Sequence, residues 1–222
     1  MILLPDILTL EELSFAQEEL AKAAFEDGKL TANGSAKAVK NNQQMQRDQE
    51  TATDLDAVLM QAMTRNPLLL AWGVPRTISL PLINRHGKGM HYGFHVDAAV
   101  TTGLSVMRRD LSVTLFLSDP SSYEGGELEV ESPGGLQRIK PAAGSGFAYA
   151  THAIHQVREV TRGVRYAAVF WLQSLIQDDA MRQSLFDLQA ATGSLADRGV
   201  MGQEMLLLSK LHQNLTRRFS NP

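Results

Sequence analysis

The feature that most constrains this sequence is a series of short segments between Val74 and Gln173, many of them rich in β-branched and aromatic residues. They are Thr77–Asn84, Met90–Val96, Asp110–Ser118, Gly126–Glu131, Gly146–Ala150, Gln156–Val160 and Val164–Gln173. Turn signals such as Asp119-Pro120, Gly125-Gly126 and Arg162-Gly163 separate them. This spacing predicts a sandwich or barrel of short strands and argues against alternating βαβ units.

The flanks of this β-rich region have helical patterns. Thr9 followed by Glu12 predicts a capping box that opens one helix, and a second helix is expected over about Ala52–Thr64. The polar stretch Asp27–Gln49 is interpreted as a loop with about one strand. The fold class is therefore α+β with a mainly β core and flanking N-terminal helices.

A helical C-terminal extension is expected after Ser174. Apolar residues recur at helical spacing on both sides of a break predicted over Thr192–Gly202. Residues 1–176 are therefore predicted to form the β-rich domain and residues 177–222 the extension.

Composition narrows the classes of function. The net charge of −3 gives no support for binding to nucleic acid or to an acidic membrane. The absence of cysteine excludes disulfides and thiolate metal sites, so a metal must be held by imidazole and carboxylate groups. The short apolar N-terminus lacks the pattern of a signal peptide, and no apolar run approaches the length of a membrane span. We therefore expect a soluble cytoplasmic protein.

His95 and Asp97 form the first candidate metal pair. In a strand, side chains two positions apart point to the same face, so both can approach one ion. A second histidine from a later strand would complete a set of two imidazoles and one carboxylate, which is typical of non-haem Fe(II) oxygenases because it leaves three coordination positions open. A His-x-Asp pair by itself often occurs by chance. It indicates a metal site only together with the other candidate residues around it.

Arg165 is the second candidate. Strand alternation places it on the same face as Ala167, Val169 and Trp171, an otherwise apolar row. A guanidinium in such a row needs an anionic partner, and its planar fork suits a carboxylate. The alternative is an edge position where Arg165 pairs with a surface acid.

Several ordered motifs lie along the chain, at Lys40–Gln44, Arg65–Pro67, Asn84-Arg85, His95–Ala99, Asp110–Asp119, Tyr123–Leu128, His155, Val160–Arg165, Phe170–Ser174 and Asp178–Leu188. Together they resemble the PKHD-type hydroxylases, bacterial prolyl-4-hydroxylase-like Fe(II)/2-oxoglutarate dioxygenases that are sometimes labelled iron-uptake factors. The resemblance covers nearly the whole chain.

This resemblance implies a double-stranded β-helix, or jelly roll, and an enzyme that couples conversion of 2-oxoglutarate to succinate and CO2 with hydroxylation of a substrate. It implies His95, Asp97 and His155 as ligands of Fe(2+), and Arg165 as the group that binds the distal carboxylate of 2-oxoglutarate. It also implies L-ascorbate as a reductant. The family name suggests a prolyl or lysyl residue as substrate, by analogy of fold alone.

Some assignments stay open. The sequence has His86 where the family pattern leads us to expect tyrosine, and either His86 or Tyr92 is a candidate contact to the cosubstrate. His152 competes with His155, but the spacing to Arg165 and the run Val160–Gly163 favour His155. His91 is interpreted as a core or supporting residue, and His212 as a structural one.

Two rival functions remain at this stage. One is a non-catalytic jelly-roll metal-binding or sensing module, and the other is a cupin-like enzyme that uses Zn or Mn. Neither rival function needs an arginine that binds the carboxylate of a cosubstrate. The sequence shows neither the identity of the substrate, whether peptide or small molecule, nor whether the protein forms a homo-oligomer.

Overall fold

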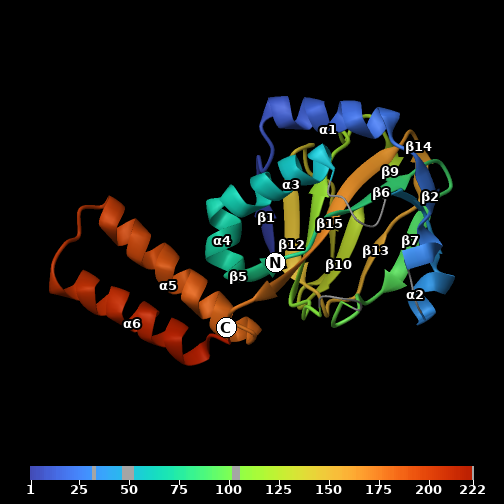
Figure 1. Cartoon of the computed structure of the whole chain (residues 1–222). Coiled ribbons are helices and arrows are strands. Elements are labelled where there is room, and N and C mark those ends of the chain that lie inside the picture. The colour runs from blue at the N-terminus through green and yellow to red at the C-terminus, as the bar shows by residue number, and fades with distance from the viewer. Residues whose placement is uncertain (32–33, 47–52, 102–105, 222) are drawn as a thin grey trace.

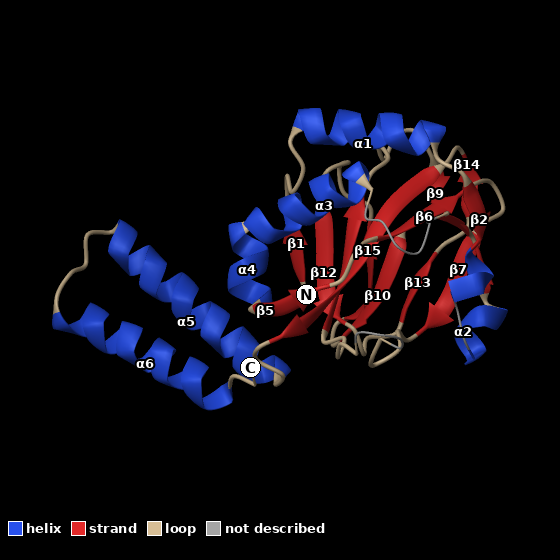
Figure 2. Ribbon diagram, in the orientation of Figure 1, coloured by secondary structure: helices blue, strands red, loops and turns tan. Residues whose placement is uncertain are grey.

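The protein was analysed as a computed structural model that describes residues 1–31, 34–46, 53–101 and 106–221. Two β-sheets face each other, and helices cover the outer side of the larger sheet (Figures 1 and 2). The larger sheet has the strand order β1 (Ile2–Leu4), β12 (Gly146–Ala150), β8 (Leu111–Phe116), β15 (Arg165–Ser174), β6 (Leu82–His86), β4 (Gln43–Met45) and β2 (Phe25–Asp27), with β5 (Pro75–Ile78) pairing with β15.

The smaller sheet has the order β11 (Gly135–Ile139), β10 (Leu128–Ser132), β13 (His155–Val157), β7 (His91–His95) and β3 (Lys40–Asn41). A separate pair joins β9 (Glu124–Gly125) to β14 (Val160–Arg162). Neighbouring strands in both sheets run antiparallel. Of the predicted alternatives, a sandwich or a barrel of short strands, the structure has the sandwich.

Helices α1 (Leu10–Lys22), α3 (Asp54–Arg65) and α4 (Pro67–Gly73) pack on the outer face of the larger sheet. Capping boxes open both α1 and α3, through Thr9 with Glu12 and Thr53 with Asp56. Both predicted N-terminal helices are confirmed, although Ala52 lies outside the described residues. The core of the protein lies mainly between this helix layer and the sheet.

Strand β8 shows how the sheet separates two environments. Leu111, Val113 and Leu115 point to the helix-covered core, whereas Phe116 belongs to a smaller apolar cluster between the two sheets. Ser112 and Thr114 share the face of Phe116, because side chains alternate along a strand. The space between the sheets is thus partly polar, and the candidate site lies there.

Two local predictions were wrong, and one strand was missed. Asp27–Gln49 is not mainly a loop: its described part contains the 3-10 helix η1 (Gly28–Thr31), α2 (Gly34–Ala38), β3 and β4. Strand β11 was not predicted, because its outward residues are exposed and its sequence lacks apolar alternation. Thr192–Asp197 remains helical, since Gly193 does not interrupt α5.

The C-terminal helices α5 (Asp179–Asp197) and α6 (Gln203–Phe219) form a hairpin that projects from the β core (Figure 1). Among the described residues, none of the helices combines the length and apolar character needed to cross a membrane. The division at residues 176 and 177 into two domains stays a prediction.

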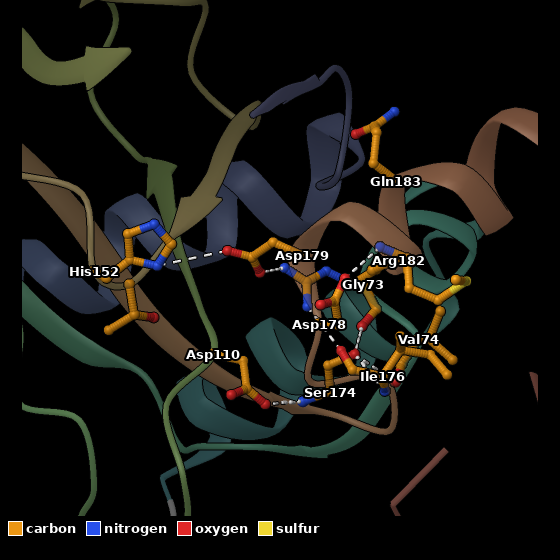
Figure 3. Close-up of polar contacts among 12 residues, drawn as sticks. Gly73, Val74, Asp110, His152, Ser174, Ile176, Asp178, Asp179, Arg182 and Gln183 are labelled. Atoms are coloured by element: carbon orange, nitrogen blue, oxygen red, sulfur yellow. Dashed lines mark hydrogen bonds and ion pairs between the residues drawn. The ribbon is translucent and has the colours of Figure 1, made fainter. Parts of the chain in front are cut away.

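A polar junction attaches this hairpin to the core (Figure 3). The buried Arg182 donates to the carbonyl of Ile176 (2.8 Å) and to Asp179. Ser174, at the end of β15, donates its hydroxyl to the carbonyl of Gly73 (2.7 Å), and its N–H donates to Asp110 (2.8 Å). The start of α5 is thereby tied to the strands that carry the candidate site.

Candidate metal centre

Strand pairing brings the two candidate histidines together. His155 on β13 lies directly opposite His95 on β7, and their ring centres are 4.2 Å apart. Directly opposed residues of an antiparallel pair point to the same face. Two histidines that are sixty positions apart in the chain therefore become neighbours on the inner face of the smaller sheet.

Asp97 lies just beyond the end of β7 and completes the cluster. Its two carboxylate oxygens lie 3.9 Å from His95 Nε2 and from His155 Nε2 respectively. One ligand atom from each of the three residues lies within 4.8 Å of the other two. Two imidazoles and one carboxylate in this arrangement suit a divalent transition metal with open coordination positions.

Backbone carbonyls orient both imidazoles. His95 Nδ1 lies 2.8 Å from the carbonyl of Gly93, and His155 Nδ1 lies 2.9 Å from the carbonyl of Ala153. These contacts favour a proton on Nδ1 and leave the Nε2 lone pair facing the cluster. Burial, reinforced by the neighbouring His155, lowers the pKa of His95 to about 4, so that this imidazole is neutral and able to bind a metal.

Asp97 is held in place from the opposite sheet. Its Oδ2 accepts hydrogen bonds from Ser112 Oγ and from Trp171 Nε1, both at 2.9 Å. The guanidinium carbon of Arg109 lies 3.9 Å from the centre of the Trp171 ring. The Asp97 carboxylate is therefore oriented by the Ser112 hydroxyl and by the Trp171 indole, and Arg109 stacks on that indole.

Arg165 lines the same cavity as these three residues. The cavity has a volume of about 570 Å³ and is lined by the three clustered residues together with Arg165, Val169 and Trp171. Tyr166, Ala168 and Phe170 pack on the other face of β15. The predicted alternation along this strand is confirmed.

The guanidinium of Arg165 is buried and incompletely bonded. The residue is 2% exposed, and its Nε and Nη2 have no hydrogen-bond partner. Burial lowers the pKa of Arg165, but the guanidinium still carries its charge at neutral pH. A buried cation with two unused donors is suited to bind a carboxylate. The alternative of an edge position with a surface acid is wrong.

A polar wall of Thr31, Lys40, Asn42 and Asn84 closes another side of the cavity. Lys40 is 4% exposed, and its ammonium donates to Thr31 Oγ1 at 3.1 Å. Asn42 donates to Asn84 Oδ1 at 3.0 Å. Burial lowers the pKa of Lys40 to about 8, although the Asp97 and Asp27 carboxylates favour its charged form.

In metal-free protein, we expect Lys40→Met to raise the free energy of unfolding by about 3 kcal/mol at neutral pH. The folded pKa is about 8 and the unfolded value is 10.5, so the penalty of burying the charge is complete below pH 8. It disappears as the pH rises toward 10.5, because the folded protein then loses its proton first. Urea unfolding at a series of pH values should therefore show a difference between variant and wild type that shrinks with rising pH.

Exposed Lys88 provides the matched control for this prediction. Lys88→Met should leave the unfolding free energy and its pH dependence close to wild type. A constant difference between Lys40→Met and wild type across the alkaline range would contradict the assignment of a lowered pKa to Lys40.

The other histidines are not among the three residues whose ligand atoms cluster. The side chain of His152 is 76% exposed and lies 3.5 Å from Asp179 (Figure 3). His91 and His212 do not line the cavity. His86 and Tyr92 both do, and the Tyr92 ring stacks on His95 with the ring centres 3.6 Å apart.

Sequence reasoning missed the residues that support the site. Ser112 and Lys40 were not identified as candidates, and Trp171 was placed on the correct face without its hydrogen bond to Asp97. A signal for Ser112 was present, because a hydroxyl at an inward position of the apolar strand β8 needs a buried partner.

Residues 81–173 match the family model of the 2OG-Fe(II) oxygenase superfamily. A PKHD-type hydroxylase of Caulobacter sp. (strain K31) is 43% identical over 98% of this chain and 97% of its own. The PKHD-type hydroxylase YbiX of Escherichia coli (strain 55989 / EAEC) is 41% identical, with 98% of this chain and 97% of the relative covered.

A solved structure of a Trichoplax adhaerens prolyl hydroxylase, in complex with a peptide fragment of the oxygen degradation domain of hypoxia inducible factor, has a TM-score of 0.59. The two chains are 15% identical in sequence, and the match covers 83% of this chain and 86% of the Trichoplax chain. At this identity the similarity concerns the fold alone, and it confirms the expected double-stranded β-helix.

Proposed function

Because this chain belongs to the PKHD-type hydroxylases of the 2OG-Fe(II) oxygenase superfamily, we propose that His95, Asp97 and His155 hold its iron and that Arg165 binds 2-oxoglutarate. The protein is a 2-oxoglutarate-dependent dioxygenase, and Fe(2+) and 2-oxoglutarate are its cofactor and cosubstrate. The reaction class consumes 2-oxoglutarate, O2 and a C–H bond of the substrate, and it produces succinate, CO2 and a hydroxylated product. The two rival functions, a non-catalytic module and a Zn or Mn cupin, lack this support.

One observation carries the residue assignment. The cavity that contains the three ligand atoms also contains the buried Arg165, whose Nε and Nη2 have no partner. Neutral imidazole and carboxylate ligands suit a ferrous ion, and a buried unpaired guanidinium suits the distal carboxylate of a keto acid. The two proposed binding functions therefore share one cavity.

Each residue has a definable role. Bound iron would supply the activation of O2 that the side chains cannot provide. Asp97 is kept in one orientation by Ser112 and Trp171, and the carbonyls of Gly93 and Ala153 fix the two imidazoles. Arg165 would orient the keto acid by binding its far end, with its keto group and near carboxylate directed toward the three ligands.

Part of the cavity wall is apolar and includes Leu82, Leu128, Val157 and Val169. Because Arg165 itself is buried, the local dielectric constant around its guanidinium is low, which strengthens the attraction between Arg165 and a bound carboxylate.

The hydroxylated substrate is a prolyl or lysyl residue or a small molecule, and the Trichoplax relative that holds a peptide is a reason to include peptides. Ascorbate as the reductant of oxidised iron and a cytoplasmic location also stay predictions.

The direct test is 2-oxoglutarate turnover by the purified protein. We expect slow succinate formation that requires Fe(II), 2-oxoglutarate and O2 together, and that stops when a chelator removes the metal. Anaerobic addition of 2-oxoglutarate to the Fe(II) protein should also produce a visible charge-transfer absorption. Absence of both signals in folded, iron-loaded protein would reject the proposal.

A further inference from the structure

Besides Arg165, two cations line the cavity and keep unused hydrogen-bond donors. Lys40 on β3 is 4% exposed, and Arg109, which lies just before β8, is partly buried. The ammonium of Lys40 donates to Thr31, and the buried Nε of Arg109 has no hydrogen-bond partner. A lysine has three N–H donors and an arginine has five, so both side chains can still bind a group that enters the cavity.

The two cations reach the metal cluster from different sheets. Lys40 Nζ lies 5.2 Å from the centre of the Tyr92 ring, which stacks on His95 in the smaller sheet. Arg109 packs on the ring of Trp171, which belongs to the larger sheet and donates to Asp97. Each cation is therefore separated from a proposed metal ligand by one aromatic ring.

Charge balance indicates what these cations bind. Among the described residues that line the cavity, Asp97 is the only carboxylate. With iron and cosubstrate bound, the two negative charges of 2-oxoglutarate would offset those of Fe(II), and Asp97 would offset Arg165. Lys40 and Arg109 would then lack a countercharge, which is unfavourable for cations removed from water.

A purely structural role does not explain Lys40. Burial disfavours its charged form, and its removal in Lys40→Met is expected to stabilise the ligand-free protein. Groups that lower stability are typical of functional sites, where a ligand supplies the missing interaction. An anionic ligand beside Lys40 and Arg109 would supply it here.

We propose that the substrate is a small molecule with two acidic groups, one bound by Lys40 and the other by Arg109, and that the hydroxylated carbon lies between them. This inference rests on the proposed function, since the charge balance requires Fe(II) and 2-oxoglutarate in the same cavity. The cavity of about 570 Å³ also has to hold the cosubstrate, so the space that remains suits a small molecule.

Anaerobic titration of the Fe(II) protein saturated with 2-oxoglutarate tests this inference. The probes are the linear dicarboxylates from malonate to suberate, each paired with its neutral diamide. Calorimetry measures probe affinity, and the charge-transfer absorption shows whether 2-oxoglutarate stays bound. At least one dicarboxylate should bind while 2-oxoglutarate is retained, and its diamide should bind at least about tenfold more weakly, because its charged hydrogen bonds are missing.

Variants of the two cations locate the bound probe. Lys40→Met and Arg109→Met should each weaken the dicarboxylate about 10- to 100-fold, because a charged hydrogen bond is lost, and should change 2-oxoglutarate affinity much less. Arg109→Lys keeps the charge but loses the planar fork, so its affinity should be intermediate. Because Lys40→Met is expected to be more stable than wild type, unfolding would not explain its weaker binding.

Lys88→Met and Arg162→Met are the matched controls, because both residues are exposed and neither lines the cavity. They should bind the probe as wild type does. Equal affinity for dicarboxylates and diamides, or unchanged probe affinity in both Lys40→Met and Arg109→Met, would overturn the inference. Preference for a blocked Asp-Gly-Asp peptide over every dicarboxylate would overturn the small-molecule assignment.

The same titration separates the two levels of the proposal. A charge-transfer absorption with 2-oxoglutarate, but no binding of any dicarboxylate, would reject the dianionic substrate and leave the proposed function intact. Absence of the absorption in folded, iron-loaded wild type would reject the proposed function, and this inference with it.

Discussion

Replacement of His155 by alanine is expected to abolish iron-dependent succinate formation, with iron affinity reduced by more than about 100-fold. His155 supplies one of three ligand atoms that lie within 4.8 Å of one another, so its loss leaves only His95 and Asp97. Iron binding would be measured by equilibrium dialysis, and succinate by a discontinuous assay at saturating 2-oxoglutarate. Far-UV circular dichroism and a melting curve would show that the variant still folds.

His152→Ala is the control for this experiment, because His152 is three residues away but lies on the surface beside Asp179. It should bind iron and form succinate as wild type does. Asp97→Asn offers a second variant of similar shape, in which an amide replaces the carboxylate that Ser112 and Trp171 hold. Normal iron binding and succinate formation in His155→Ala would show that the proposed metal site is wrong.

Arg165→Met is expected to raise the dissociation constant of 2-oxoglutarate by about 100-fold or more, because a bidentate charged contact in a buried site is lost. Iron affinity should be nearly unchanged, because Arg165 is not among the three clustered residues. Turnover should recover in part at very high 2-oxoglutarate concentration. Calorimetric titration of the Mn(II)-loaded protein separates cosubstrate affinity from metal affinity.

Arg165→Lys sharpens this test, since it keeps the positive charge and loses the planar fork. Its affinity for 2-oxoglutarate should lie between those of wild type and Arg165→Met. The control is Arg162→Met, because Arg162 is exposed and pairs with Glu124 on the surface. Equal 2-oxoglutarate affinity in Arg165→Met and wild type would place the distal carboxylate elsewhere in the cavity.

Local pattern was sufficient for much of the fold. Side-chain alternation on β15 correctly separated Arg165 and Trp171, which face the cavity, from Phe170 in the core. The Thr9 capping box marked the start of α1 to the residue. Local pattern failed for β11, which pairs with its neighbour β10 but whose exposed residues lack apolar alternation. It also failed for the segment after Asp27, where β3 and β4 are held by pairing with the distant strands β7 and β6.

Only part of the candidate site, like only part of the fold, was predictable from local sequence pattern. His95 and Asp97 are two positions apart, so local geometry alone placed them together. Strand alternation singled out Arg165 as a charged side chain in an apolar row. His155 was selected through resemblance to a family, because its approach to His95 depends on sheet register. The register pairs His155 with His95 and Arg165 with His86, and no short segment contains that information.

The amino-acid sequence by itself determined the strand-rich architecture, the side chains on each strand face and the ligand types available to a metal. These properties depend on neighbours within a few positions. Only the tertiary structure decided that His86 faces Arg165, that Ser112 and Trp171 hold Asp97, and that Lys40 is buried in the cavity wall. Those contacts join residues far apart in the chain, and they exist only when both sheets have closed around the cavity in one register.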